Sequence, residues 1–258
     1  MSGAIITVIV TAYLFAGLAI GSFLNVVIYR VPRGLSVISP PSRCSNCGYQ
    51  LKPWDNIPIL SYFLLRGRCR SCGVRFGVSY VVVEALNLFL WASLLARLGL
   101  TFTTLIEAIF SSVLLAGSVI DIKTRTIPRT VIYLGITMVV LLTSADSIFR
   151  RDYNVLWRSL LLGTISFLIF FSIFVFSKNS IGFGDVRLSF LIGFAVGIYG
   201  YQPVIDFFYL SFASAALYGL VLIIRSKGGR KTKIAFGPFM AIGAYFGLML
   251  LNSIHILG

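Results

Sequence analysis

The chain has 258 residues, of which 58% are hydrophobic and only 12% are charged, and its mean hydropathy is +0.94. Soluble domains are about half apolar and about a quarter charged, so this composition excludes an ordinary soluble protein and indicates a membrane protein. The net charge of +14 would suit a nucleic-acid-binding protein, but the positive-inside bias of membrane proteins explains the charge without nucleic acid.

Apolar stretches of near-membrane length recur along the whole chain. Crossing the hydrocarbon core takes about 20 apolar residues in a helix, and unbroken apolar runs favour helices over the alternating strands of a barrel. The sequence therefore predicts an all-α polytopic membrane protein with about eight transmembrane helices, of which the fourth is short and the weakest prediction. The expected helices lie at 4–29, 79–98, 102–120, 130–146, 156–176, 186–201, 203–224 and 235–254.

One long polar insert interrupts this pattern between the first and second helices. We expect three parts: a first transmembrane helix over 1–29, a small loop domain over 30–78 and a seven-helix core over 79–258. The first apolar run has no basic start and no small-residue cleavage site, which predicts a retained helix and not a cleaved signal peptide.

The basic residues predict the orientation of the chain in the membrane. Eight helices place both termini on the same side. If that side is the outer one, the inner loops carry all 22 basic residues except Arg97, Arg150, Arg151 and Arg158. We therefore expect a cytoplasmic loop domain, membrane lipids as partners and no nucleic acid.

The loop domain holds all four cysteines of the chain. Cys44 and Cys47 form one Cys-x-x-Cys turn followed by glycine, and Cys69 and Cys72 form a second. Four thiolates in two such turns can hold Zn²⁺ tetrahedrally with no open position, which predicts a structural zinc site. Two disulfides, a redox use or free thiols are the alternatives, although disulfides are rare in a reducing compartment.

Two of the eight acidic residues lie at the inner ends of apolar stretches. Asp121 ends the third expected helix, and Asp185 opens the sixth within Gly182-Phe183-Gly184-Asp185. Paired carboxylates can share a proton and perform acid–base hydrolysis. Simpler roles are a helix N-cap for Asp185 and a helix-end ion pair for Asp121.

Several short motifs occur in a fixed order along the chain together with these two aspartates. They are Gly21 to Arg30, the two cysteine turns, Trp54 to Pro58 with Leu60-Ser61-Tyr62, Asp121 with Ile127-Pro128, Gly182 to Asp185, and Phe236 to Phe239. In this order they resemble the type IV prepilin peptidase family over nearly the whole chain.

The resemblance implies a G-x-G-D aspartyl protease with Asp121 and Asp185 as its catalytic residues. Such enzymes act in the bacterial inner membrane, where they remove leader peptides from prepilins and pseudopilins on the cytoplasmic side. Many members then methylate the new N-terminus with S-adenosylmethionine.

Other residues of the site follow less directly. Gly182 and Gly184 leave room beside Asp185 for a substrate backbone, and Lys123 and Arg187 each lie two residues after an aspartate. We expect all four to bind substrate. Glu84, with Gly77, is a candidate for contact with the methyl-donor cofactor, although Glu84 also suits the positive end of a helix dipole.

The stretch before Glu84 departs from the family pattern. Val78 to Val83 contain Tyr80 but lack the basic residue and the proline that many members carry there. Arg187 stands where many members have lysine, and it keeps the charge with a different hydrogen-bond geometry. These differences leave methyl transfer less well supported than proteolysis.

Two other functions fit parts of this pattern. A proton-coupled transporter would place acids near the middle of broken helices, whereas these aspartates lie near helix ends. A non-catalytic zinc-knuckle adaptor of a secretion system would tolerate loss of both aspartates.

Overall fold

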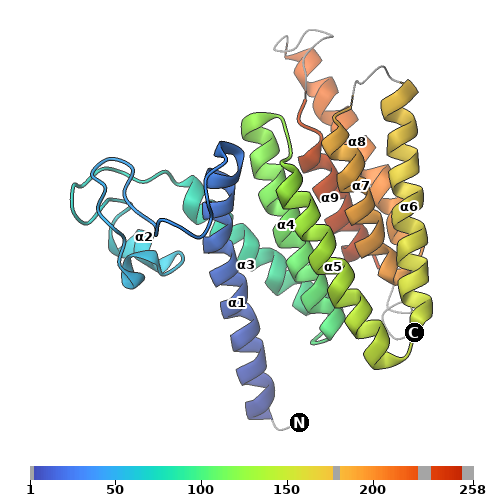
Figure 1. Cartoon of the computed structure of the whole chain (residues 1–258), viewed down its shortest axis with the longest axis horizontal. Coiled ribbons are helices and arrows are strands. Elements are labelled where there is room, and N and C mark those ends of the chain that lie inside the picture. Colours follow the sequence, from blue (N-terminus) through green and yellow to red (C-terminus); the bar gives the residue numbers. More distant parts are fainter. Residues whose placement is uncertain (1–2, 177–180, 226–233, 252–258) are drawn as a thin grey trace. The chain divides into compact units, whose positions relative to one another are not determined.

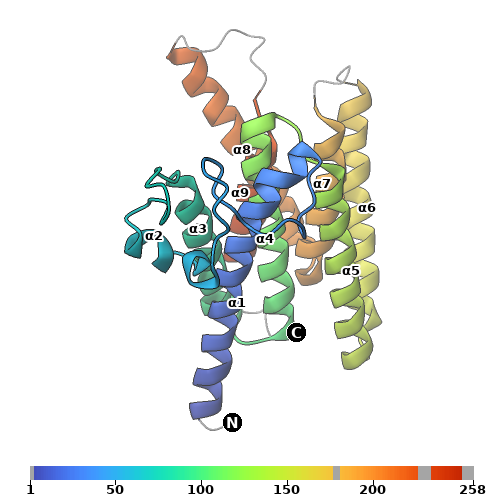
Figure 2. The same ribbon diagram turned by 60° about the vertical axis from the view of Figure 1, so that its left-hand side comes forward.

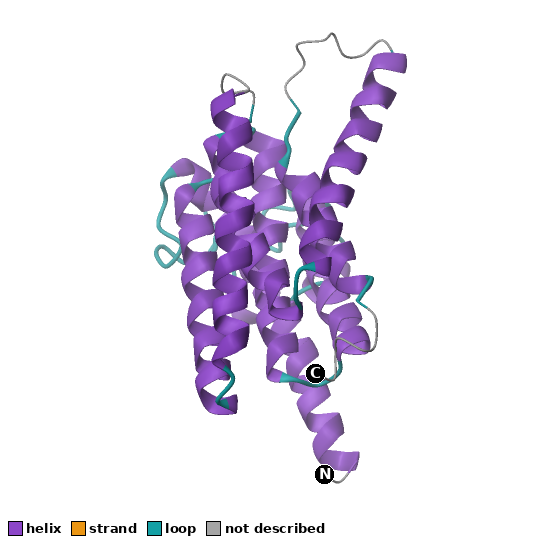
Figure 3. Cartoon of the chain, turned by 90° about the vertical axis from the view of Figure 1, so that its right-hand side faces the viewer, coloured by secondary structure: helices purple, strands orange, loops and turns teal. Residues whose placement is uncertain are grey.

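The computed structural model describes residues 3–176, 181–225 and 234–251. It is helical without a strand in that part of the chain, as Figure 3 shows. Some of the residues that predict the orientation lie outside the described residues. They are Lys178, the basic residues between 226 and 233, and both chain ends. The structure divides into two compact units, residues 1–100 and 101–258.

The first unit is a pair of helices with a loop domain between them. The helices are α1 (Gly3–Arg30) and α3 (Ser79–Leu98), and they pack against each other (Figure 1). Gly17 allows this approach, because a Cβ at that position would lie 2.8 Å from the Trp91 ring. The Asn87 amide also donates to the Gly17 carbonyl at 2.7 Å. Small residues and interhelical amides commonly join membrane helices in this way.

The loop domain contains only short helical segments. They are the 3₁₀ turns η1 (Val31–Arg33) and η2 (Pro53–Asn56) and the helix α2 (Leu60–Leu64), which can be followed in Figure 2. A domain of this size cannot bury a large apolar core, so other bonds must stabilise it.

The second unit is a helical bundle. Its members are α4 (Phe102–Thr124), α5 (Arg129–Arg150), α6 (Tyr153–Phe176), α7 (Phe183–Val196), η3 (Gly197–Tyr199), α8 (Gln202–Ile224) and α9 (Gly237–Met249). α4 packs against α5 and α9, α6 against α7, and α8 against α9, as Figure 1 shows.

Glycines bring the shorter helices of this bundle close to their neighbours. A Cβ at Gly163 of α6 would lie 3.0 Å from the Phe194 Cβ of α7, and a Cβ at Gly243 of α9 would lie 2.6 Å from the Phe207 carbonyl of α8. α7 is almost entirely buried. Large apolar side chains such as Leu217 of α8 remain exposed on the outer helices, as lipid-facing residues do.

Each of the eight expected stretches holds a helix, so the predicted all-α membrane class is confirmed. Six helices, α1, α3, α4, α5, α6 and α8, are long and apolar enough to cross a membrane. α5 has 22 residues and is longer than expected, whereas α7 has 14 and α9 has 13. The total of eight membrane crossings therefore stays a prediction.

Candidate active site and metal centre

The four cysteines of the loop domain come together. Their sulfur atoms all lie within 4.8 Å of one another, with Cys44 Sγ 3.8 Å from Cys72 Sγ and Cys47 Sγ 4.0 Å from Cys69 Sγ. Thiolates at 2.3 Å from a tetrahedral zinc ion lie about 3.8 Å apart. No disulfide joins any two of the four. The cluster therefore has the donors and the spacing for a metal ion.

Two similar backbone turns produce this arrangement. In the first turn, the Cys44 N–H donates to the Tyr49 carbonyl and the Gly48 N–H donates to the Cys44 carbonyl. In the second, the Cys69 N–H donates to the Val74 carbonyl and the Gly73 N–H donates to the Cys69 carbonyl. Gly48 and Gly73 have φ values of +72° and +69°, which side chains rarely adopt. The glycine after each cysteine pair is therefore what closes the turn.

An ion pair links the metal cluster to the turn at η2. Asp55 is buried and accepts from Arg70 at 2.7 Å, and Tyr49 Oη lies 3.4 Å from the same carboxylate. Burial by itself would raise the pKa of the Asp55 carboxyl, but the hydrogen bonds from Arg70 and the Lys52 backbone bring its pKa below the ordinary value. The charged form of Asp55 therefore stabilises the loop.

Glu84 has a structural partner. It is buried in α3, and its Oε2 accepts from the Ile59 backbone N–H at 2.7 Å. Ile59 has φ +62° and stands directly before α2, an unfavourable conformation for a β-branched residue. Gly77 is exposed before α3. Glu84 therefore holds the strained turn that leads into α2.

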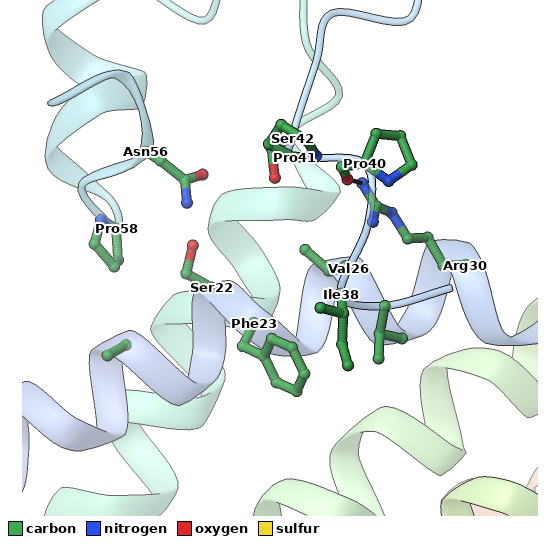
Figure 4. A pocket seen from close by; sticks show the side chains of 12 residues that line it. Ser22, Phe23, Val26, Arg30, Ile38, Pro40, Pro41, Ser42, Asn56 and Pro58 are labelled. Atoms are coloured by element: carbon green, nitrogen blue, oxygen red, sulfur yellow. Dashed lines mark hydrogen bonds between the residues drawn. The ribbon is translucent and has the colours of Figure 1, made fainter. Parts of the chain in front are cut away.

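A cavity of about 340 Å³ lies between α1 and the loop domain. Figure 4 shows Ser22 of α1 and Asn56 of η2 pointing toward one another across it, with Phe23 beside them. Arg30 is held at one side by bonds to the Ser36 and Pro40 carbonyls. The lining combines apolar faces with a few polar groups, as small-molecule sites do.

Asp121 lies in the last turn of α4 and is 4% exposed. Its Oδ2 accepts from the Gly237 backbone N–H, the first residue of α9, at 2.9 Å. A Cβ at position 237 would lie 2.9 Å from that same oxygen. The bond therefore depends on glycine, and it fixes the Asp121 carboxylate against the N-terminus of α9.

Asp185 lies in the first turn of α7 and is 8% exposed. The helix starts at Phe183 with Gly182 as N-cap, so Asp185 itself is not the capping residue that simple sequence reasoning allows. The neighbouring Gly184 and the Gly237 that binds Asp121 both lie against Ile127, so the two acids are at adjoining helix ends.

Ile127 lies where the segments around both acids meet. Cβ atoms built at Gly184 of α7 and Gly237 of α9 would lie 3.6 Å and 3.1 Å from its side chain. Ile127 is buried in the turn between α4 and α5. One apolar side chain thus packs against both the helix that carries Asp185 and the glycine that binds Asp121.

Two basic residues flank the acids. Lys123 is exposed at the end of α4. Arg187 is half-buried, and its guanidinium lies 4.5 Å from the Phe183 ring centre and 5.6 Å from the Tyr133 ring centre. Neither cation has an acidic partner among the described residues.

Sequence reasoning missed several of these contacts. The Phe236 to Phe239 stretch resembled the family, yet nothing in its composition indicates a donor to Asp121. The contacts of Asp55 with Arg70 and of Glu84 with Ile59 likewise join residues whose separation in the sequence does not predict a contact. Glu107 of α4 is fully buried, and its carboxyl oxygens lack hydrogen-bond partners among the described residues.

Two family models match the chain. The bacterial peptidase A24 N-terminal domain matches residues 15–98, and the type IV leader peptidase family matches residues 108–224. The gap between the two matches coincides with the division between the two compact units.

Three relatives with the name prepilin leader peptidase/N-methyltransferase resemble the chain over most of its length. One from Bacillus subtilis (strain 168) is 30% identical over 92% of this chain and 93% of the relative. One from Pseudomonas aeruginosa is 30% identical over 90% of this chain and 87% of the relative. One from Pectobacterium carotovorum subsp. carotovorum is 32% identical over 93% of this chain and 92% of the relative. No solved structure matches the chain.

Proposed function

The chain belongs to the type IV leader peptidase family, and on this premise we propose that it is a membrane aspartyl endopeptidase that removes the leader peptide of prepilins or pseudopilins. Asp121 and Asp185 are its catalytic pair. The observation that supports this proposal is the burial of both carboxyls at helix ends of the second unit that meet around Ile127.

The pair supplies both proton transfers of peptide hydrolysis. Two buried carboxyls this near cannot both ionise easily, so one keeps a proton. The ionised carboxylate takes a proton from water, whose oxygen bonds to the peptide carbonyl carbon, while the other carboxyl protonates the carbonyl oxygen. The C–N bond then breaks as the nitrogen receives a proton. The leader leaves with a new carboxylate and the pilin with a new amino group.

Glycines beside Asp185 give the substrate backbone access. Gly182 is exposed, and the atoms nearest to a Cβ built at Gly184 belong to Ile127, at 3.6 Å or more. These two positions therefore add no side chain of their own beside the Asp185 carboxyl, where an extended peptide has to bind. Lys123 and Arg187 flank this approach and bind the substrate through their unpaired charges.

The metal centre is structural in this account. Cys44, Cys47, Cys69 and Cys72 fit Zn²⁺ by donor type and by spacing. A bound zinc ion links the two turns of a loop too small to form its own core, and four thiolates leave no ligand position for substrate.

The chain also transfers a methyl group from S-adenosylmethionine to the new N-terminus. That cofactor supplies the methyl group on a positively charged sulfur. Gly77 is exposed and suits such contact, whereas one oxygen of Glu84 already accepts from Ile59. The cavity lined by Ser22, Phe23 and Asn56 has both apolar and polar walls, as an amphiphilic nucleoside requires. We therefore assign the cofactor to this cavity and not to Glu84.

We propose that the chain lies in the bacterial inner membrane with both termini outside. The ends of α4, α7 and α9 that carry Asp121, Asp185 and Gly237 then face the cytoplasm, as does the loop domain.

Reconstitution with a prepilin tests these assignments. The enzyme in lipid nanodiscs is expected to release the leader, and mass spectrometry should find one added methyl group on the mature N-terminus when S-adenosylmethionine is present. Calorimetry should show cofactor binding that weakens in Phe23→Ala and persists in Glu84→Gln. An intact prepilin after incubation with correctly inserted enzyme would refute the protease assignment.

A further inference from the structure

The loop domain carries a second cavity, at the base of the turn that holds Cys69 and Cys72. It has a volume of about 480 Å³, and its lining includes Arg66, Arg68 and Arg75 together with Tyr62 and Phe76. All three arginines are exposed and have no acidic partner among the described residues. Three guanidinium groups around one cavity favour an anion, and guanidinium geometry suits phosphate oxygens in particular.

Next to this cavity, α2 presents an apolar face. Leu60, Phe63 and Leu64 are 52%, 67% and 70% exposed. Their spacing of i, i+3 and i+4 places them on one side of the helix. Leu65 and Tyr62 of the same segment line the cavity, so the cationic cavity and the apolar face lie on opposite sides of one short helix, as in amphipathic segments at a membrane surface.

The ends of the loop domain restrict where this helix can be. The loop begins after α1 and ends before α3, and both helices are long and apolar enough to cross a membrane. Fewer than fifty residues separate them, so the loop stays close to the bilayer surface. Its one acid, Asp55, is buried against Arg70 and does not oppose a negative surface.

We propose that this helix and the cavity beside it bind an anionic phospholipid, with the headgroup phosphate in the cavity of Arg66, Arg68 and Arg75 and the apolar face of α2 in the lipid interface. Exposed apolar side chains beside basic residues are typical of segments that lie in the plane of an anionic membrane. The lipid thereby anchors the metal-bearing loop to the bilayer surface, independently of any catalytic activity.

Photo-crosslinking of the full chain tests where the apolar face lies. A photoreactive phenylalanine analogue replaces Phe63 in nanodiscs of phosphatidylcholine with or without phosphatidylglycerol, and Leu35, an exposed apolar residue outside α2, is replaced as the comparison site. We expect crosslinks from position 63 to lipid that increase at least severalfold with phosphatidylglycerol, and no such increase at position 35, which directly follows a membrane span. Crosslinks from position 63 mainly to a second copy or to the second unit would overturn the proposal.

Native mass spectrometry tests the cavity. The wild type is expected to retain phosphatidylglycerol in preference to phosphatidylcholine, and the combined Arg66→Gln, Arg68→Gln and Arg75→Gln variant to lose that preference. Arg43→Gln removes an exposed charge of the same loop outside the cavity, and this variant should keep the preference for phosphatidylglycerol. Equal retention in the triple variant, or complete displacement of the lipid by millimolar inorganic phosphate, would show that the cavity is not a lipid site.

Discussion

The carboxylate of Glu84 accepts a hydrogen bond of 2.7 Å from the Ile59 backbone N–H, 25 positions earlier in the chain. The contact joins α3 to the strained residue before α2. Glu84 therefore supports the loop domain from the membrane helix that follows it. Any effect of Glu84 on methyl transfer would then come through the shape of the loop.

Glu84→Ala is expected to destabilise the loop by about 1–3 kcal/mol, because it leaves a part-buried N–H without an acceptor. Limited proteolysis of residues 30–78 in nanodiscs measures this effect. Glu84→Gln keeps an acceptor oxygen and should behave almost as wild type. If both variants lose cofactor binding while their loops resist protease normally, Glu84 contacts the cofactor and not the loop.

Asp55 makes the stability of the loop sensitive to acid. Its pKa is lowered in the folded loop, so its contribution is complete above the ordinary aspartate pKa of about 3.9 and is lost as the pH falls through the lower folded value. Protease resistance should therefore fall more steeply toward acid in wild type than in Asp55→Asn, which lacks this titration. Parallel pH curves would remove Asp55 as the cause.

The metal cluster predicts one zinc ion per chain. Cys44→Ser should remove that ion and increase proteolysis of the loop, because three ligands no longer close the site. Ser45→Ala in the same turn is the control and should keep the metal. A wild-type chain without metal, or a loop unchanged by a chelator, would contradict the structural role.

Gly237 positions Asp121 through its backbone N–H. In Gly237→Ala the new Cβ would lie 2.9 Å from Asp121 Oδ2, so the carboxylate must shift. Displacement of a reacting group by about 1 Å can cost about a hundredfold in rate, and we expect a loss of that size in kcat/KM for leader removal. Gly219→Ala on α8, where the nearest atom is 3.9 Å away, should retain wild-type activity. Equal rates in the two variants would argue against the positioning role.

Much of this architecture could be predicted from local patterns. The eight apolar stretches each hold a helix, as their hydrophobic length indicates. Each pair of cysteines is brought together by a local turn that ends in a glycine with positive φ, and four thiols of this spacing indicate that the two pairs share one metal ion. The lengths of α7 and α9 could not be predicted. Hydropathy does not distinguish a short helix buried by its neighbours from one that spans lipid.

Contacts between distant residues were beyond sequence reasoning. Asp121 and Gly237 are 116 positions apart, and their bond depends on how α9 packs against α4. The role of Glu84 is another such case, because its partner is a backbone N–H that any residue at position 59 except proline could supply. Backbone donors leave no trace in side-chain patterns.

The central claim is that Asp121 and Asp185 perform hydrolysis together. The direct measurement is leader release from a prepilin by purified wild type, Asp121→Asn and Asp185→Asn in nanodiscs, with Asp152→Asn, an exposed acid outside the bundle interior, as the control. Each of the first two variants is expected to insert normally but to release no leader above background, while Asp152→Asn should cut at the wild-type rate. Normal cutting by either Asp121→Asn or Asp185→Asn would contradict this claim.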